Sequence, residues 1–331
     1  MKIIKYEKRP LRRFLKWSLI IFLLLFGLLN WVAYNHARKF TQSDPSLQGQ
    51  HPQGQVYKMA HAPFWEKLGY AFWGISVPKS QNTIEPDYEF ETLWFVGKDS
   101  LEGWLLESEE DSIKGIVTLW HGYGASKAQL IANAYWFLKQ GYDCLLVDFP
   151  AHGGSTGTTV TIGWAEAESV KLVNDWLKKE RAEQPRFLFG SSMGSVAILK
   201  AAAEDDLGAE ALILECPFAS LRHAIIKRFE LMKIPACGMP DLLMFWGGAQ
   251  HGFWAYNHSS LRYAEKVKTP TLILYGEQDP KVDQSEVENI LKHLAAENKM
   301  LKTLPCAEHN YLISSCPELW PETVLKFLDT L

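Results

Sequence analysis

Cysteine pairs with the spacing of a zinc or redox motif are absent from this sequence. The chain has five cysteines, and no two of them form a Cys-x-x-Cys pair. Because five is an odd number, they cannot all pair with one another. Cys144 and Cys216 lie in apolar runs, which predicts buried thiols, and one disulfide among the other three stays possible. Zinc and thioredoxin-like chemistry therefore have no support in the sequence.

Charged side chains are absent from a second region, since Asp, Glu, Lys and Arg do not occur from Trp17 to Ala37. At about 1.5 Å per residue in a helix, this stretch matches the thickness of a bilayer core. Trp17, Trp31 and Tyr34 lie near its ends, where interfacial aromatic residues are common. We therefore predict a transmembrane helix over residues 17–37.

Two other interpretations of this apolar stretch stay open. A cleaved signal peptide usually has a shorter apolar region that is followed by a small-x-small site. Ala33 and Ala37 are instead preceded, two positions earlier, by Trp31 and Asn35. A buried core helix rarely lacks charge over so many turns beside a basic flank. We favour an uncleaved membrane anchor.

Charge is unevenly distributed along the chain, whose formal net charge is −4. Residues 1–16 carry seven Lys and Arg side chains against one acid, Glu7, so the remainder is strongly acidic. An acidic body offers no electrostatic footprint for nucleic acid, and we expect no such partner. The basic residues 1–16 predict a cytoplasmic tail, with the body on the far side of the membrane, in the periplasm if the cell is bacterial. The unpaired cysteines argue mildly against an oxidising compartment.

The remaining sequence predicts a linker followed by one large folded unit. Residues 38–86 are rich in Gln, Pro, Gly and Ser and include an aromatic, amphipathic segment, which we expect to pack against the body. From residue 87 to 331, β-rich apolar runs alternate with helical spacing, which predicts an α/β fold with a mostly parallel sheet. The predicted strands are 88–96, 103–107, 115–120, 143–148, 186–189, 211–215, 271–275 and 301–304. The predicted helices are 127–140, 162–179, 193–203, 284–296 and 321–331.

One long stretch interrupts this alternation. No strand is evident between Glu215 and Thr271, although Phe, Trp, Met and Leu are abundant there. Long insertions of this kind are often lids over a site. We therefore predict a helical cap over about residues 217–268.

A Gly-x-Ser-x-Gly motif occurs at residues 190–194, with Ser192 at its centre. The motif alone is weak, but here it follows an apolar strand and precedes a helix of small residues. A sharp strand-to-helix turn needs glycines because side chains would clash there. The motif predicts Ser192 as a nucleophile at the carboxyl edge of the sheet. A glycine-rich loop with a surface serine is the plainer alternative.

The segment His121-Gly122-Tyr123-Gly124 directly follows the predicted strand 115–120. Acyl transfer creates an oxyanion that needs preorganised N–H donors. We expect these donors to be the backbone amides of Tyr123 and Met193. His121 itself is expected to brace the loop.

A base and an acid complete the predicted triad. His309 is one of ten histidines, but its place just after the last strand favours it as the base for Ser192. Asp279 follows the preceding strand and would orient His309. Asp283 and Glu215 are competing candidates for that role. With Asp279, the chain order is Ser, Asp, His, as in α/β-hydrolases.

These motifs together resemble the α/β-hydrolase superfamily over residues 88–331, and the serine-aminopeptidase-like and monoacylglycerol-lipase-like branch within it. Residues 148–155 read Asp-Phe-Pro-Ala-His-Gly-Gly-Ser and are similar to the family's D-x-x-G-H-G-x-S loop, with Ala151 in place of the first glycine. Residues 272–279 are similar to its strand followed by G-x-x-D. The resemblance implies a Ser-His-Asp mechanism through an acyl-enzyme, without metal or cofactor.

The predicted function is a membrane-anchored esterase or lipase-like enzyme that cleaves a small-molecule or lipid-like acyl ester or thioester. A serine peptidase or an acyltransferase could use the same triad. From another class, a catalytically inactive binding or scaffold module stays open. Haloalkane dehalogenases and epoxide hydrolases of this fold carry Asp at the nucleophile position, so Ser192 excludes them.

Overall fold

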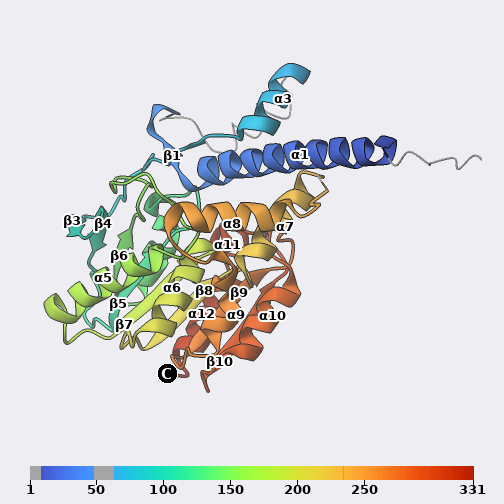
Figure 1. The fold of residues 1–331 in the computed structure, drawn as a ribbon. Helices are drawn as coiled ribbons and strands as arrows, with labels where there is room; N and C mark the ends of the chain where they lie inside the picture. Colours follow the sequence, from blue (N-terminus) through green and yellow to red (C-terminus); the bar gives the residue numbers. More distant parts are fainter. Residues whose placement is uncertain (1–8, 48–62, 234) are drawn as a thin grey trace, which may run out of the picture.

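An eight-stranded sheet forms the centre of the computed structural model, which describes residues 9–47, 63–233 and 235–331. The strand order is β10-β9-β8-β7-β5-β6-β4-β3, and all neighbours are parallel except the pairs made by β4 (Figure 1). The strands are β3 Glu91–Val96, β4 Ser100–Leu106, β5 Gly115–Trp120, β6 Tyr142–Val147, β7 Arg186–Ser191, β8 Ala211–Glu215, β9 Thr271–Gly276 and β10 Lys299–Leu304. The predicted fold class is confirmed, and each predicted strand lies within a few residues of an observed one.

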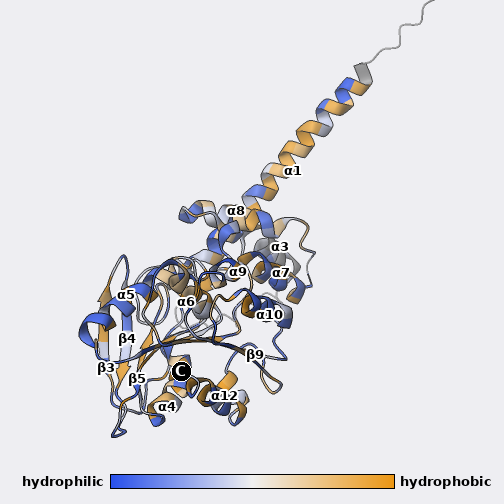
Figure 2. Cartoon of the chain, turned by 90° about the horizontal axis from the view of Figure 1, so that it is seen from below, coloured by the Kyte–Doolittle hydropathy of each residue, from blue (hydrophilic) through white to orange (hydrophobic). Residues whose placement is uncertain are grey.

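Helices cover both faces of the sheet (Figure 2). One face carries α4 Ile131–Lys139, α11 Leu312–Ser315 and α12 Leu319–Leu328, and the other carries α5 Glu166–Glu180, α6 Met193–Glu204 and α10 Gln284–His293. Because water reaches neither face, the central strands can be apolar at every position. All six residues of β5, and all six of β9, are buried.

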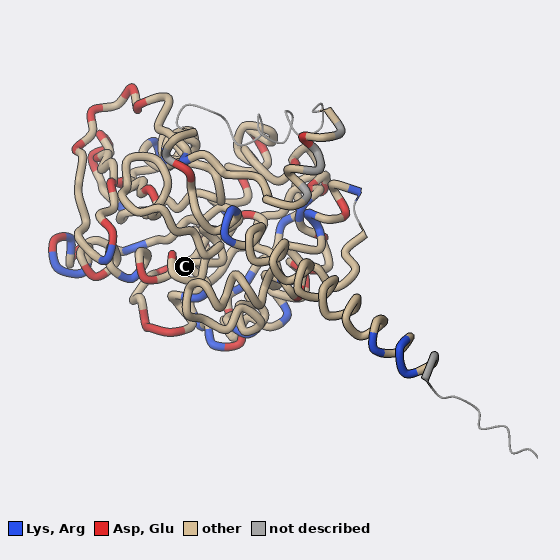
Figure 3. The backbone as a smooth tube through the Cα atoms, turned by 45° about the horizontal axis from the view of Figure 1, so that its top comes forward, with Lys and Arg blue, Asp and Glu red and all other residues tan. Residues whose placement is uncertain are grey.

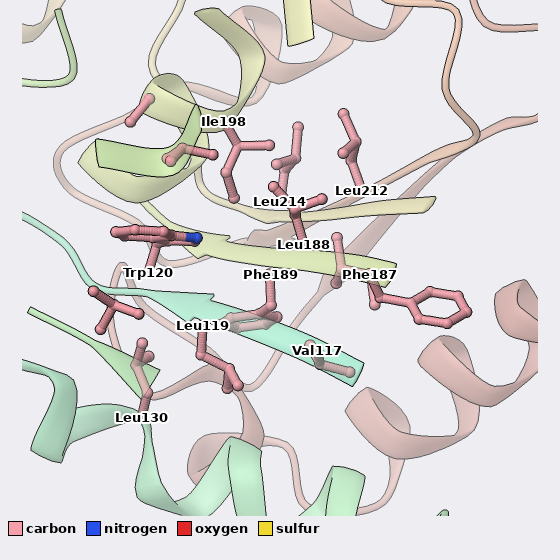
Figure 4. Close-up of a cluster of buried hydrophobic side chains, with 14 of the residues drawn as sticks. Val117, Leu119, Trp120, Leu130, Phe187, Leu188, Phe189, Ile198, Leu212 and Leu214 are labelled. Carbon is pink, nitrogen blue, oxygen red and sulfur yellow. The ribbon is translucent and has the colours of Figure 1, made fainter. Parts of the chain in front are cut away.

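The core lies between these layers. Figure 4 shows Leu119 and Phe189, on neighbouring strands, pointing to the face that α4 and α12 cover, while Ile198 of α6 lies on the opposite face. Each is fully buried, and burial of a side chain of this size contributes about 1.5–3 kcal/mol.

Two predicted helices begin differently from expectation. Residues Lys127–Leu130 form a 3₁₀ turn, η2, before α4. The predicted helix 162–179 begins at Glu166, because Ile162 has a φ of 58° and cannot continue a right-handed helix. The Glu166 carboxylate accepts hydrogen bonds from the amides of Thr161 and Gly163, both at 2.8 Å, and so fixes this turn.

A buried ion pair joins η2 to the loop after β6. Lys127 is fully buried, and its ammonium lies 2.5 Å from Asp148 Oδ2 and 2.5 Å from Glu102 Oε1. The Lys127 ammonium also lies 4.2 Å from the centre of the Trp104 ring. Asp148 is fully buried, and although burial raises its pKa, Lys127 lowers it further, so the carboxylate stays ionised.

The N-terminal helix α1, Arg9–Thr41, is longer than the predicted span 17–37. It is long and apolar enough to cross a membrane, a test that a signal sequence also passes. Its large apolar side chains between Leu11 and Leu29 are mostly exposed. Basic residues lie at its outer end (Figure 3) and again in its last turn, as Arg38 and Lys39. Residues 1–8 of the predicted tail and much of the predicted linker lie outside the described residues.

The inner end of α1 packs against the predicted cap, which is helical. The cap contains α7 Leu221–Leu231, α8 Met239–His251, η3 Ala255–Asn257 and α9 Ser260–Ala264. Figure 1 shows α1 lying along α8. Ala33 and Ala37 are buried, and Trp246 of α8 donates a hydrogen bond to Asn30 Oδ1 at 3.2 Å. The inner end of α1, from Asn30 to Thr41, is therefore part of the folded body.

The aromatic segment after the linker is helical. It forms α3, Phe64–Trp73, which packs on α1. The Trp73 ring meets the Trp31 ring edge-on at 4.6 Å, although Trp73 remains 58% exposed. The segment therefore packs on the part of α1 that also contacts the cap.

A disulfide joins Cys306 to Cys316. The sequence left this pairing open among three cysteines. Cys237 is free and exposed, while Cys144 and Cys216 are buried thiols, as predicted. The disulfide closes the loop that carries His309.

We expect Lys127→Met to destabilise the protein by about 3–5 kcal/mol, because it leaves Asp148 buried without its partner. The measurement is urea unfolding of the full chain in neutral detergent, followed by tryptophan fluorescence. Lys139→Met is the matched control, since Lys139 is exposed on α4 and its replacement should change stability by less than about 0.5 kcal/mol. Equal unfolding midpoints for the two variants would contradict this account.

Candidate active site

The turn between β7 and α6 places Ser192 at the carboxyl end of the sheet. Ser192 has φ 52° and ψ −108°, a conformation that L-residues rarely adopt. A Cβ atom at Gly194 would lie 2.3 Å from the Trp120 carbonyl oxygen, and one at Gly190 would lie 2.6 Å from the backbone of Gly194. The two glycines are therefore required for this turn, as the motif predicted.

A chain of two hydrogen bonds begins at Ser192. His309 Nε2 lies 2.9 Å from Ser192 Oγ, and His309 Nδ1 lies 2.6 Å from Asp279 Oδ2. The second oxygen of Asp279 accepts the amides of Lys281 and Val282, at 2.7 and 3.1 Å. The structure thus brings the three residues of the predicted triad together, although they are far apart in the sequence.

The two competing acids lie elsewhere. Asp283 begins α10 in a capping box and pairs with Lys227 at 2.8 Å. Glu215 accepts a hydrogen bond from Trp320 Nε1 at 2.7 Å. Burial raises the pKa of Glu215 to about 8, so this carboxyl is protonated at neutral pH. Neither acid is among the hydrogen-bond partners of His309 in the described part of the chain.

The electrostatics of the site favour a neutral imidazole. Burial lowers the pKa of His309, and the hydrogen bond to Asp279 offsets this only in part. The pKa of Asp279 is below its usual value, because the His309 hydrogen bond and charge outweigh the effect of burial. At neutral pH, His309 can therefore donate from Nδ1 to the carboxylate and accept the Ser192 hydroxyl proton at Nε2.

The loop after β5 approaches Ser192 from the opposite side. A Cβ atom at Gly122 would lie 3.4 Å from Ser192 Cβ. Among the described residues, the amide of Tyr123 donates no hydrogen bond. Met193 is the first residue of α6, so its amide has no acceptor within the helix. Both predicted oxyanion-hole residues thus have an available N–H beside Ser192.

Two buried histidines hold this loop in place. His121 Nε2 accepts the amide of Phe149 at 3.1 Å, and His152 Nε2 accepts the amide of Gly124 at 3.1 Å. Burial lowers the pKa of both rings, that of His152 to about 4, so each stays neutral and can accept. His121 braces the loop, as expected. The sequence did not predict that His152, in the motif at residues 148–155, would hold this loop through Gly124.

The departure from the family motif at Ala151 has a structural consequence. Ala151 has a φ of 64°, a region in which glycine is favoured. Its amide donates to Thr156 O at 3.0 Å, which closes the loop despite the strain.

A contact between α1 and the loop after β5 was not predicted. The hydroxyl of Tyr123 donates to Phe40 O at 2.8 Å, and the two rings stack at 5.2 Å. Burial raises the pKa of Tyr123, so the phenol remains a donor. The backbone position of Tyr123 is therefore tied to the inner end of α1.

Cys216, Asp279 and His309 lie close enough to hold a metal ion, with their ligand atoms within 4.8 Å of one another. Burial raises the pKa of the Cys216 thiol well above its usual value, which disfavours the thiolate that a metal requires. The Asp279 and His309 atoms already bond each other. The cluster fits an acid–base pair better than a metal centre.

Comparisons with known proteins agree with this architecture. The sequence profile of the serine aminopeptidase S33 family matches residues 111–244, and that of the dienelactone hydrolase family matches residues 242–317. The uncharacterized protein YqkD of Bacillus subtilis is 25% identical over 218 residues, which are 65% of this chain and 71% of that protein.

Solved structures share the fold. The esterase Pf2001 of Pyrococcus furiosus aligns with a TM-score of 0.64 and 22% identity, over 76% of this chain and 96% of its own. Est1E of Butyrivibrio proteoclasticus, with bound ferulic acid, aligns with a TM-score of 0.55 and 20% identity, over 71% and 97% of the two chains. This chain therefore has the α/β-hydrolase fold, and its residues 111–244 are similar to the serine aminopeptidase S33 family.

Proposed function

We propose that this protein is a serine hydrolase that cleaves acyl esters or thioesters, with Ser192 as nucleophile, His309 as base and Asp279 as its partner. The observation that carries the proposal is the continuous hydrogen-bonded chain from Ser192 Oγ through His309 to Asp279. The fold likeness to proteins described as esterases, and to one with bound ferulic acid, supports the choice of ester substrates.

The mechanism has two steps. Ser192 Oγ attacks the acyl carbonyl while His309 Nε2 accepts its proton, and the amides of Tyr123 and Met193 stabilise the oxyanion. The protonated His309 then donates to the leaving group, and an acyl-enzyme remains. Water, activated by the same base, attacks the acyl-enzyme and releases the acid.

A serine peptidase is the second candidate, because the matched family takes its description from an aminopeptidase. An acyltransferase would differ only in excluding water from the acyl-enzyme. An inactive binding module would not require the free amides and the oriented imidazole that face Ser192.

We further propose that residues 17–37, within α1, anchor the protein in a membrane and that residues 87–331 form the hydrolase domain on the far side, with residues 1–16 in the cytoplasm. The exposed apolar surface of α1 supports the anchor. The Cys306–Cys316 disulfide supports an oxidising compartment for the body, against the weak argument from the unpaired cysteines.

Ser192→Ala should abolish labelling by a fluorophosphonate probe and lower kcat for a short acyl ester by about 10⁴-fold or more, because the nucleophile is lost. The matched control is Ser191→Ala, which removes a neighbouring hydroxyl with no hydrogen bond among the described residues. A folded wild-type protein that neither labels nor hydrolyses any ester would favour the binding module instead.

Asp279→Asn should lower kcat by about 10⁴-fold, because an amide cannot hold His309 in the tautomer that accepts the Ser192 proton. Glu215→Gln is the control, since Glu215 contacts Trp320 rather than His309 and should retain most of the activity. Ester hydrolysis by both purified variants is the measurement. The reverse order of activities would move the acid role to Glu215.

The proposed topology predicts that Cys237, which is free and exposed, reacts with a membrane-impermeant maleimide added to intact cells or, for a bacterium, to cells with a permeabilised outer membrane. Cys237→Ser should remove the label. N-terminal sequencing of the membrane-bound protein should begin at the basic tail. Labelling only after cell lysis would reverse the orientation, and a start beyond residue 37 would identify a cleaved signal sequence.

A further inference from the structure

Two half-buried cations lie beside the triad without partners. Arg228 is on cap helix α7, and Lys281 follows Asp279 by two residues. Among the described residues, neither the guanidinium of Arg228 nor the ammonium of Lys281 makes a hydrogen bond or an ion pair. Only the backbone amide of Lys281 is used, by Asp279.

The other cations of α7 behave differently. Arg222 pairs with Asp241 at 2.8 Å. Lys227, adjacent to Arg228 in sequence, pairs with Asp283 at 2.8 Å and with Glu230 at 3.0 Å. The Lys227–Asp283 pair also fixes α7 against the segment that follows β9. Arg228 thus lacks a carboxylate on a helix whose other Lys and Arg side chains have one.

Both cations act on the catalytic groups. Each lowers the pKa of His309 through its charge, and Arg228 also interacts with Asp279 and with the Tyr123 hydroxyl. Arg228 belongs to the cap, whereas Lys281 belongs to the loop after β9. Burial lowers the pKa of Arg228, and burial together with the Arg228 charge lowers that of Lys281.

Three acids lie near the two cations. The exposed Glu308 acts on Lys281 through its charge but forms no ion pair with it among the described residues, and the other two acids, Asp279 and Glu286, are already engaged. Asp279 uses both oxygens, for His309 and for two backbone amides. Glu286 accepts the amides of Ala219 and Asp283 at 2.8 and 3.2 Å. Neither acid has a hydrogen bond to Arg228 or Lys281. A pair of cations so placed is unfavourable in an empty site, since burial weakens hydration and like charges repel.

We propose that Arg228 and Lys281 bind an anionic group of the substrate, a carboxylate or a phosphate, next to the scissile acyl bond. The guanidinium fork of Arg228 suits both anions, and Lys281 supplies a second positive charge. The same charges repel the free α-ammonium group of an aminopeptidase substrate. This inference rests on the proposed hydrolase function and narrows it to anionic esters.

The test compares four esters with the full chain in neutral detergent: phenyl butanoate, 4-(butanoyloxy)benzoate, 4-(butanoyloxy)phenyl phosphate and monophenyl succinate. Phenyl butanoate is neutral. The second and third esters carry a carboxylate and a phosphate on the leaving group, and monophenyl succinate carries a carboxylate on the acyl group. We expect the wild type to prefer at least one anionic ester over the neutral one by about tenfold or more in kcat/KM, as a charge-assisted hydrogen bond allows. The preferred ester identifies the anion and its side.

We expect Arg228→Gln and Lys281→Gln each to raise KM for the preferred anionic ester. The loss of kcat/KM for that ester should exceed the loss for phenyl butanoate by about tenfold. Lys292→Gln is the control, because it removes one exposed positive charge from α10 and should leave all four values unchanged. A wild type that prefers the neutral ester, or equal losses for all esters, would overturn the inference.

A binding measurement separates this inference from the proposed function. Ser192→Ala should bind the preferred anionic ester uncleaved, and calorimetry should show binding about tenfold weaker when Arg228→Gln is added. Calorimetry of Ser192→Ala with all four esters gives the answer even if the wild type hydrolyses none of them. Equal binding of neutral and anionic esters would refute the anion site, whereas failure of the wild type to react with a fluorophosphonate would refute the hydrolase.

Discussion

Close backbone contact between the end of β5 and the start of α6 determines where every group of the candidate site lies. The Gly194 backbone packs so closely on the Trp120 carbonyl that a methyl group at Gly194 would force the two apart. That movement would carry the Met193 amide away from the loop at Gly122 and would release the strained backbone of Ser192. One packing constraint therefore sets the geometry of Ser192 and of the two proposed oxyanion donors. It depends on Gly190 and Gly194 having no side chain.

Buried polar groups then hold the loops around that contact. His121 and His152 can accept backbone amides only while they are neutral, and burial keeps them so. The ion pair of Lys127 with Asp148 joins the loop after β6 to η2, the turn that follows the loop after β5. A buried ion pair of this kind adds little net stability, since both charged groups have lost their hydration. Its main effect is to fix the positions of the two segments that it joins. Buried side chains therefore hold each loop by hydrogen bonds to its backbone, while the Tyr123 amide stays free.

The parts of this arrangement that the sequence could predict have local signatures. Ser192, Asp279 and His309 each follow a predicted strand, and parallel strands bring their carboxyl ends to one edge. Their catalytic roles stay predictions, but their proximity follows from the alternation of strands and helices. The Cys306–Cys316 pairing has no such signature, because three cysteines allowed several choices. The docking of α1 on α8 was also missed, since an apolar helix that packs on one side looks the same in sequence as one that is free.

The position of α1 changes how the apolar N-terminal helix is understood. Its outer half presents apolar side chains to the surroundings, while its inner end meets the cap and bonds the Tyr123 hydroxyl through Phe40. The Tyr123 amide is a proposed oxyanion donor, so α1 helps to fix the position of that donor. Arg228 belongs to cap helix α7, which also contacts α8. The two elements that flank the site, α1 through Tyr123 and the cap through Arg228, also contact each other through α8, so the proposed anchor and the proposed anion site belong to one packed unit.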